Sequence, residues 1–431
     1  MTDITLQTAA GHHKDIGSNE KQATDTVPDK DEASPASGWG SEAPNGGLRA
    51  WLVVLGAWCT AFCSFGWLNS VGIFQEYYQN ELLRQYSAST ISWIPSLQIF
   101  FMMASGPIIG ALYDRHGPRQ LILVGTFLHV FGIMMTSLGK EYWQIMLAQG
   151  VCSALGVAAI FQPAINTLHG WFSTHAGAAF GIVASGSSIG GVIFPIMVTR
   201  LIKEVGFGWA MRICGFLLLA LLIVANLTVR SFNPPRPSKV TGADLARPFR
   251  EPAYLLLTLG FLLFTFGIYV PITYLPVQAL SAGMDVNLIH FFGRIFAGVL
   301  GDKVGRYNIF IIVGYLTALW ILALWIPIST AGGIIAFAAL FGFCSGAYVS
   351  LIAPLIAQIS PLREIGFRTG LAFFIGSWGG LTTSPINGAI MAGPSGLTGI
   401  KIFSGVFCFA GTVAITASRV YRTGWNLTAK F

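Results

Sequence analysis

The chain has 431 residues, of which 54% are apolar and only 10% are charged, whereas an ordinary soluble domain carries about 25% charged residues. With 51 Gly, 32 Phe and a mean hydropathy of +0.65, this composition excludes a soluble enzyme of this size and indicates a membrane protein that spans the bilayer many times. The net charge of +7 does not indicate a nucleic-acid-binding protein, because the basic residues fall singly between apolar runs rather than in one cluster.

The opening of the chain differs from the rest in charge and polarity. Eight of the 18 acidic residues lie in the first 42 positions, and from Arg49 onward the chain has 22 basic and 10 acidic residues. We expect residues 1–48 to be a disordered cytoplasmic tail, because so polar a segment cannot bury enough apolar surface to fold. The tail lacks the features of a signal peptide, so the first span is expected to direct membrane insertion.

The remainder is organised into apolar runs. A helix needs about 20 mainly apolar residues to cross the roughly 30 Å hydrocarbon core. Eleven runs meet this length and one, at 288–301, is short. We expect helices at 51–73, 91–113, 120–138, 143–165, 177–199, 209–229, 253–277, 288–301, 308–327, 332–357, 366–392 and 400–420.

The distribution of basic residues predicts the orientation. With both termini in the cytoplasm, 18 of the 25 Lys and Arg lie inside, six lie outside, and Arg294 lies in the membrane. This is the pattern of the positive-inside rule. We predict cytoplasmic termini and, as the expected location, the plasma membrane.

The polar stretch from Ser231 to Pro252 divides the spans into six and six. We therefore expect an N-terminal bundle at 49–230, a cytoplasmic linker at 231–252 and a C-terminal bundle at 253–431. Internal repeats of this kind are typical of secondary transporters, whose substrate sites lie near the midplane between the repeats.

A loop motif occurs once in each half. Asp302 follows Asp114 by 188 residues, and each lies among glycines and basic residues at the expected cytoplasmic end of a helix pair. The glycines permit a tight turn and close helix approach, while Asp114 can pair with arginines and accept from a helix N-terminus; the alternative is a surface turn with incidental charges. The expected gating residues are Gly110, Asp114, Arg115, Gly117, Arg119, Asp302, Lys303, Gly305 and Arg306.

The eighth span is shorter than its counterpart. Phe65-Gly66 and Phe266-Gly267 are 201 residues apart, 13 more than the two aspartates, so roughly a dozen residues are absent between the seventh span and Asp302. The remaining 14-residue run would form a helix of about 21 Å. Either the eighth helix is a half-span supported by its neighbours, or the chain lacks a coding segment.

This duplicated six-plus-six layout with its loop motif resembles the major facilitator superfamily over residues 49–425. The resemblance implies an all-α integral membrane protein with two six-helix bundles and nominally twelve transmembrane helices. Residues 44–51 and the glycine-rich stretch 181–191 after Trp171-Phe172 are similar to the two signatures of the monocarboxylate-porter family, especially its fungal branch. The chain departs from them at Asn45, where the family has an acidic residue, and at Thr174–Ala176, where it has a basic pair.

Three residues are candidates for substrate binding and coupling. An arginine inside a membrane is costly and normally faces a cavity or a partner, and Arg294 matches the family's arginine for a substrate carboxylate; the alternative is that Arg294 snorkels to the inner surface. His290 and Asn69 stand where well-studied relatives carry an aspartate and a lysine. Both departures weaken a simple transfer of proton and lactate symport to this chain.

The other polar and aromatic residues of the spans are less specific. No Asp or Glu lies at the centre of an apolar run, so His129 and His290 remain as groups that titrate near neutral pH; the alternative for His129 is a helix contact. Aromatic residues of the seventh and eleventh spans either line a cavity or pack against other helices, namely Phe264, Phe266, Tyr269, Tyr274, Phe373, Phe374 and Trp378.

No nucleophile with its base, nucleotide loop or metal cluster is visible, so we expect neither an enzyme nor a cofactor. The expected function is secondary active transport, by alternating access, of a small organic solute: a monocarboxylate-like or other organic anion, or a secondary metabolite. Protons are the family's usual coupling ion, and the direction stays open. The alternative is a membrane sensor or a remnant on the same fold that binds without transporting.

Overall fold

The computed structural model describes residues 44–232, 246–281, 305–328, 330–361 and 364–426 together with Phe431. All of them belong to one compact unit, Ser37–Phe431. They form helices joined by short turns, and the described ranges contain no β-strand. The expected eighth span at 288–301 lies outside the described residues.

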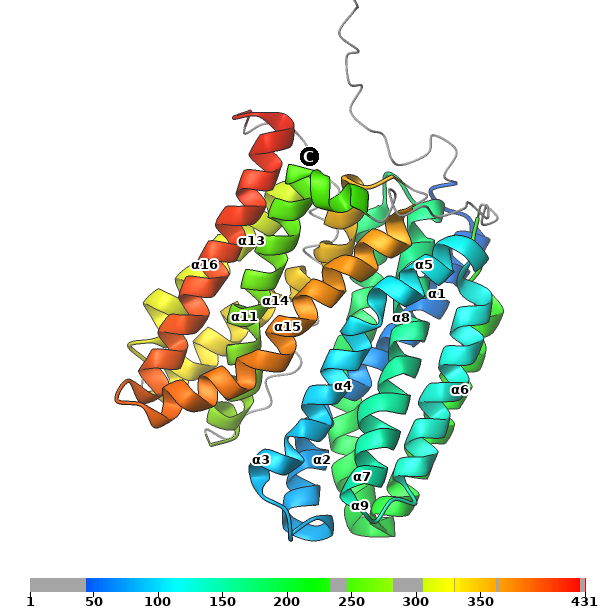
Figure 1. The fold of residues 1–431 in the computed structure, drawn as a ribbon, viewed down its shortest axis with the longest axis vertical. Helices are drawn as coiled ribbons and strands as arrows, with labels where there is room; N and C mark the ends of the chain where they lie inside the picture. The colour runs from blue at the N-terminus through cyan, green and yellow to red at the C-terminus, as the bar shows by residue number, and fades with distance from the viewer. Residues whose placement is uncertain (1–43, 233–245, 282–304, 329, 362–363, 427–430) are drawn as a thin grey trace, which may run out of the picture. The chain divides into compact units, whose positions relative to one another are not determined.

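The helices before the polar stretch 231–252 form what we call the first group (Figure 1). They are α1 (Leu48–Ala61), η1 (Phe62–Gly66), α2 (Val71–Tyr77), η2 (Tyr78–Leu82), α3 (Ala88–Ile91), α4 (Trp93–Ala104), α5 (Gly106–His116), α6 (Pro118–Thr136), α7 (Tyr142–Ile145), η3 (Met146–Ser153), α8 (Ala154–Trp171) and α9 (Ala176–Thr228).

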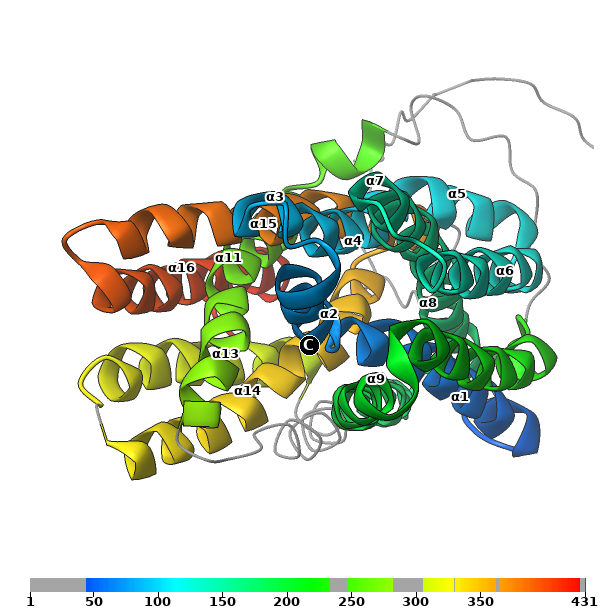
Figure 2. The same ribbon diagram turned by 90° about the horizontal axis from the view of Figure 1, so that it is seen from below.

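The helices that follow form the second group, which lies beside the first in both ribbon views (Figure 2). They are η4 (Arg247–Arg250), α11 (Pro252–Ser281), α13 (Arg306–Leu319), η5 (Trp320–Trp325), α14 (Ala331–Gln358), α15 (Ile365–Ala392) and α16 (Gly396–Thr423).

Among the described residues, eight helical stretches are long and apolar enough to cross a membrane. One of them, α9, has 53 residues but breaks at Gly206, whose φ of 80° is not helical, so it covers the fifth and sixth expected spans. α14 and α15 have 28 residues each, or about 42 Å of helix. The helices thus follow the expected apolar runs throughout the described part of the chain.

The first span differs from a simple helix. It extends from Leu48 to Leu82 and contains two π-helical segments, η1 and η2, with a turn at Asn69–Ser70. The expected limits of 51–73 therefore missed its last turns. π-helical segments inside α-helices are frequent at functional sites, because they change the direction of the side chains that follow.

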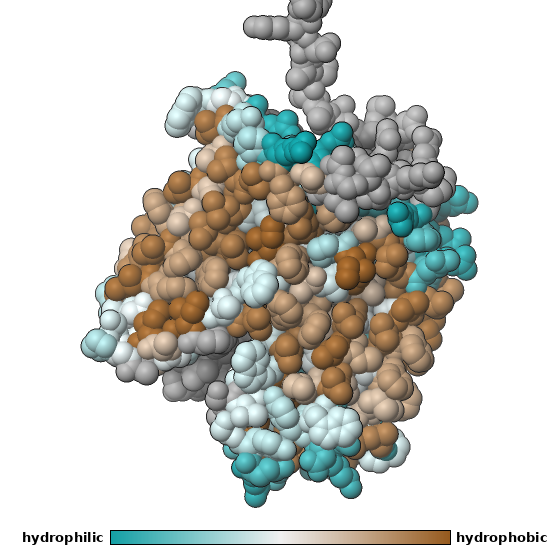
Figure 3. All heavy atoms as spheres, in the orientation of Figure 1, coloured by the Kyte–Doolittle hydropathy of each residue, from teal (hydrophilic) through white to brown (hydrophobic). Residues whose placement is uncertain are grey.

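Apolar side chains gather in two main clusters, one in each group. The first cluster is built from residues 50–229, with Ala353 as its one buried member from the second group, and the other is built from residues 254–415. Phe373 of α15 packs against both clusters. The outer face of the helices is brown over its middle and teal at two opposite ends, as a lipid-facing surface requires (Figure 3).

Equivalent glycine contacts recur in the two groups. A Cβ at Gly186 of α9 would lie 2.6 Å from the Trp58 carbonyl oxygen and 3.3 Å from the Phe62 nitrogen of the first span, and one at Gly376 of α15 would meet the Phe261 ring of α11. These glycines let the fifth and eleventh expected spans pack closely against the first and seventh.

Candidate functional site

The tightest crossing between the two groups joins α5 to α15 (Figure 1). Gly106 and Gly110 on α5 face Gly370 and Gly366 on α15, and a Cβ at Gly106 would lie 2.5 Å from the Gly370 carbonyl oxygen. A Cβ at Gly110 would overlap the carbonyl group of Gly366. Small residues four apart let helix backbones touch in a membrane. Only glycine fits at this crossing.

Asp114 continues the same face of α5 by one turn. Its Oδ1 accepts from the backbone N–H of Gly366 at 3.0 Å, and its Oδ2 accepts from the N–H of Phe367 at 2.9 Å. These are unsatisfied amides of the first turn of α15, where the helix dipole favours an anion. No ion pair among the described residues involves Asp114. Backbone amides hold this carboxylate, instead of the arginines that we also expected.

Gln162 of α8 holds the other side of the same residue. Its Nε2 donates to the Gly366 carbonyl oxygen at 3.1 Å, and the side chain is 3% exposed. A Cβ at Gly370 would lie 2.7 Å from Nε2, so the amide depends on that glycine for room. Side chains of the first group therefore hydrogen-bond to both the N–H and the C=O of Gly366. We call these contacts of Asp114 and Gln162 with Gly366, with the glycine crossing, the latch.

An ion network lies behind the latch. Arg368, which is fully buried, makes a two-pronged contact with Glu251 at 2.6 and 2.7 Å and contacts Glu364 at 2.9 Å. Glu364 also pairs with Arg247 at 2.9 Å. The hydrogen bonds and charge of Arg368 hold the pKa of the Glu251 carboxyl below its usual value of 4.5. The network ties the start of α15 to η4 and the start of α11.

The second loop motif makes a contact of its own between the groups. Gly117 and Gly305 both have positive φ values, 75° and 108°, and each precedes a helix, so the repeated glycines serve the same turn. Arg306 donates from its guanidinium to the Ser173 carbonyl oxygen at 3.0 Å. The predicted gating residues Asp302 and Lys303 lie outside the described residues, and Arg115 and Arg119 are exposed.

Asn45 joins the two signature stretches. Its Oδ1 accepts from the Ser173 N–H at 2.7 Å, the Ser173 hydroxyl at 2.9 Å and the Thr174 N–H at 2.9 Å. Its own N–H donates to the Trp171 carbonyl oxygen at 3.0 Å. An amide oxygen is sufficient for this cap, which explains how Asn stands at a position where the resembled family has an acid.

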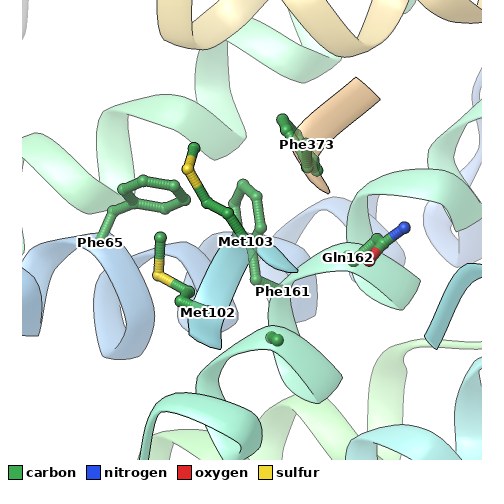
Figure 4. A pocket seen from close by; sticks show the side chains of 7 residues that line it. Phe65, Met102, Met103, Phe161, Gln162 and Phe373 are labelled. Atoms are coloured by element: carbon green, nitrogen blue, oxygen red, sulfur yellow. The ribbon is translucent and has the colours of Figure 1, made fainter. Parts of the chain in front are cut away.

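A small pocket lies between the groups, about 10 Å along α15 from the latch by helix rise. Figure 4 shows Phe65 and Met103 pointing toward one another inside it. The space is about 10 Å³, or roughly one water molecule. Of the aromatic residues singled out in the seventh and eleventh spans, Phe373 is the one that faces it. The lining residues are Phe65, Met102, Met103, Ala158, Phe161, Gln162 and Phe373.

The structure places the candidate binding residues unevenly. Asn69 lies at the turn in the first span, where its amide donates to the Phe65 carbonyl oxygen at 2.7 Å and fits against Gly191 of α9. Arg294 and His290 lie outside the described residues. The roles of these three residues stay predictions.

His129 is fully buried in α6 and bridges two other helices. Its Nε2 lies 3.1 Å from the Cys63 carbonyl oxygen in η1, and its Nδ1 lies 2.9 Å from the Ser153 hydroxyl in η3. A carbonyl can only accept, so Nε2 carries a hydrogen in this arrangement. The geometry matches a helix contact.

Sequence reasoning missed Gln162, Gly366 and Gly370. The spacing of four between Gly366 and Gly370, equal to that between Gly106 and Gly110, was a visible signal for a helix crossing. Gln162 gave no such signal, because a single polar residue in an apolar run is common.

Comparison with known proteins agrees with this architecture. The profile described as "Major Facilitator Superfamily" matches residues 53–293. The chain is 55% identical over 400 residues to the MFS transporter asaE of Aspergillus flavus, covering 90% of each chain. It is 47% identical over 424 residues to the Fujikurins efflux protein of Gibberella fujikuroi, covering 96% of this chain and 89% of that one.

A solved structure shows the same fold. The crystal structure of the E. coli fucose:proton symporter FucP superimposes with a TM-score of 0.67 at 12% identity, covering 84% of this chain and 98% of that chain. Relatives and fold together indicate membrane transport and an integral membrane protein, and they are consistent with a chain that is not an enzyme. The chain belongs to the Major Facilitator Superfamily.

Proposed function

We propose that this protein exports a small organic solute, a secondary metabolite, by alternating access, with the latch as the gate at its cytoplasmic end. The observation that carries the proposal is that Asp114 and Gln162 of the first group both hydrogen-bond to Gly366 of the second group. These hydrogen bonds can break and form again when the groups move. Three hydrogen bonds from Asp114 and Gln162 to the start of α15, the Arg306–Ser173 contact and a glycine crossing join the groups at this end, and no described ion pair crosses there. Such an interface can open and close without unfolding either group.

Opening requires specific contacts to break together. If the groups rock apart at this end, Asp114 loses two backbone amides and Gln162 loses the Gly366 carbonyl oxygen. Arg306 then also leaves Ser173. Each freed group meets water at the opened end, which offsets most of the cost of breaking these hydrogen bonds.

The export direction is supported by a relative rather than by geometry. The protein of Gibberella fujikuroi, 47% identical, is named for efflux of fujikurins. We propose that the protein lies in the plasma membrane and that its Asp114 end faces the cytoplasm, as the distribution of basic residues predicts. A solute that enters from the cytoplasm would then meet the pocket behind the latch.

We also propose roles for the predicted binding residues and for a coupling ion. Where a solute carries an anionic group, Arg294 would receive that group, and Asn69 and His290 would contact the solute or the coupling proton. In the pocket itself, the described lining residues carry no charge. A proton as the coupling ion is the family's usual choice.

The experiment is deletion of the gene in its source organism, followed by mass spectrometry of all metabolites in cells and medium. Export predicts that at least one metabolite falls in the medium and accumulates in the cells, with recovery on reintroduction of the wild-type gene. A Gly110→Leu gene should fail to restore export, because the larger side chain cannot fit the crossing, whereas Gly388→Ala should restore it, because its Cβ meets nothing within 4 Å. An unchanged distribution would contradict export and favour the sensor alternative.

A further inference from the structure

Gln162 takes part in both the pocket and the latch. It lines the pocket between the groups, and its amide holds the Gly366 carbonyl oxygen of the latch at 3.1 Å. The other lining side chains are apolar, so within the described residues Gln162 is the polar member of the pocket wall. A change at the pocket that reorients this amide therefore acts directly on the latch.

The pocket is small in the described state. It has room for roughly one water molecule, and its wall is shared between six residues of the first group and Phe373 of the second. A larger solute has to displace part of this wall, in which Phe373 is the residue from the second group. The hydrogen bond from Gln162 to Gly366 crosses the same boundary between the two groups. A solute that separates the groups there therefore competes with this hydrogen bond.

The chemistry of the wall indicates what can enter. Phe65 and Phe161 pack edge to face with ring centroids 4.7 Å apart. Met102 and Met103 are flexible, polarizable side chains that fit varied ring surfaces. Placing an ionised group among these side chains is costly, while a carbonyl oxygen is satisfied by one amide donor.

We infer that Gln162 is a specificity-determining residue that donates to a carbonyl oxygen of an uncharged, mainly apolar ring compound, and that this exchange releases Gly366 and opens the latch. This inference rests on the proposed transport function. The amide keeps one hydrogen bond throughout, first to the helix and then to the solute. The apolar wall contacts the ring of the solute, and Gln162 binds its carbonyl oxygen.

The test uses purified protein in nanodiscs and a matched pair of probes, fluorenone and fluorene, which differ in the carbonyl group. Spin labels at Gln120→Cys and Tyr421→Cys, both exposed at the Asp114 end, report latch opening as a distance distribution. Cys152 is replaced in this background, since the other five cysteines are buried. At equal membrane concentrations, fluorenone should increase the open population about three- to tenfold more than fluorene, the range expected for one hydrogen bond.

Two variants isolate the amide. Gln162→Met keeps size and flexibility but removes the donor, so the open population should rise without probe and the two probes should act alike; Gln162→Leu gives a second variant if the first is poorly folded. The matched control is Gln98→Met, which alters a buried glutamine of α4 that is bonded to Gln149 and neither lines the pocket nor contacts Gly366. It should preserve the difference between the probes.

Three results would overturn the inference: equal shifts by both probes in the wild type, no shift by either, or a shift by fluorene-2-carboxylate alone, which would indicate an anion site. The readout is the label distance rather than flux. A negative result here therefore leaves the metabolite experiment unaffected, and absence of export in cells leaves this distance measurement interpretable.

Discussion

Asp114 and Gln162 hold the same residue from different helices: Asp114 of α5 accepts from the N–H of Gly366 at 3.0 Å, and Gln162 of α8 donates to its C=O at 3.1 Å. Gly366 is the second residue of α15, so its N–H has no partner within that helix. The side chains satisfy it from the other group. This arrangement makes the start of α15 the point at which the two groups are joined.

Replacing Gly110 by Ala should loosen this junction. The added Cβ would overlap the Gly366 carbonyl, and because the clashing atoms are backbone, no side-chain rotation relieves it. We expect the ratio of open to closed states at the Asp114 end to rise about five- to 150-fold, since overpacking of a tight contact costs about 1–3 kcal/mol. The Gln120–Tyr421 label distance measures it. Gly388→Ala on the other end of α15 is the control, and equal distances in the two variants would be inconsistent with a closed glycine crossing.

Asp114→Asn tests the charge at the start of α15. An asparagine can accept one of the two amides but turns a donor toward the other. Hydrogen bonds to charged groups contribute about 1.5–3 kcal/mol, so the latch should open roughly tenfold or more. The same label pair reports the change. A distribution like that of the wild type would mean that the carboxylate does not hold the closed state.

Glu251 should make stability depend on acid pH. Arg368 lowers the folded-state pKa of Glu251, so this stabilisation is fully present above the usual pKa of 4.5 and is lost as pH falls through the lowered value. Glu251→Gln leaves the buried Arg368 with Glu364, and we expect a loss of about 1–3 kcal/mol at pH 7, less than for a fully buried pair because Glu251 is partly exposed.

The measurement is the midpoint of thermal unfolding in detergent between pH 7 and pH 3. The wild type should approach the Glu251→Gln variant as the pH falls. The control is Glu81→Gln, which removes an exposed pair with Arg84 and should change stability by less than about 0.5 kcal/mol. A constant gap between wild type and Glu251→Gln at every pH would refute the pKa shift.

Asn45 should be replaceable by aspartate but not by alanine. Alanine removes three accepted hydrogen bonds and also has to adopt the positive φ of 54°, so we expect a loss of about 1–3 kcal/mol. Aspartate offers the same acceptor and tolerates that backbone conformation. Thermal unfolding should therefore rank wild type and Asn45→Asp together, above Asn45→Ala. The reverse order of the two variants would contradict the cap.

Much of this fold was predictable because each helix has to be apolar along its whole length. The repeat of Asp114 and Asp302 indicated two equivalent loops, and Gly117 and Gly305 do turn the chain with positive φ. The break in the first span was not predictable, since π-helical segments depend on packing rather than on composition.

The partners of the site residues were beyond the sequence for a different reason. Asp114 and Gly366 are 252 residues apart, and nothing local specifies which helix N-terminus an aspartate will meet. The sequence also favoured Arg294, because an arginine in a membrane stands out, over Gln162, whose role depends entirely on the neighbour that α15 brings to it.

Paired distance measurements across both ends of the helices test the central claim, which is that the latch closes one end while the other is free to open. The labels Gln120→Cys and Tyr421→Cys report the Asp114 end, and Lys140→Cys and Thr398→Cys, both exposed, report the opposite end. In Gly110→Ala, alternating access predicts a longer distance for the first pair together with a shorter distance for the second. A longer first distance with an unchanged second distance would contradict the account.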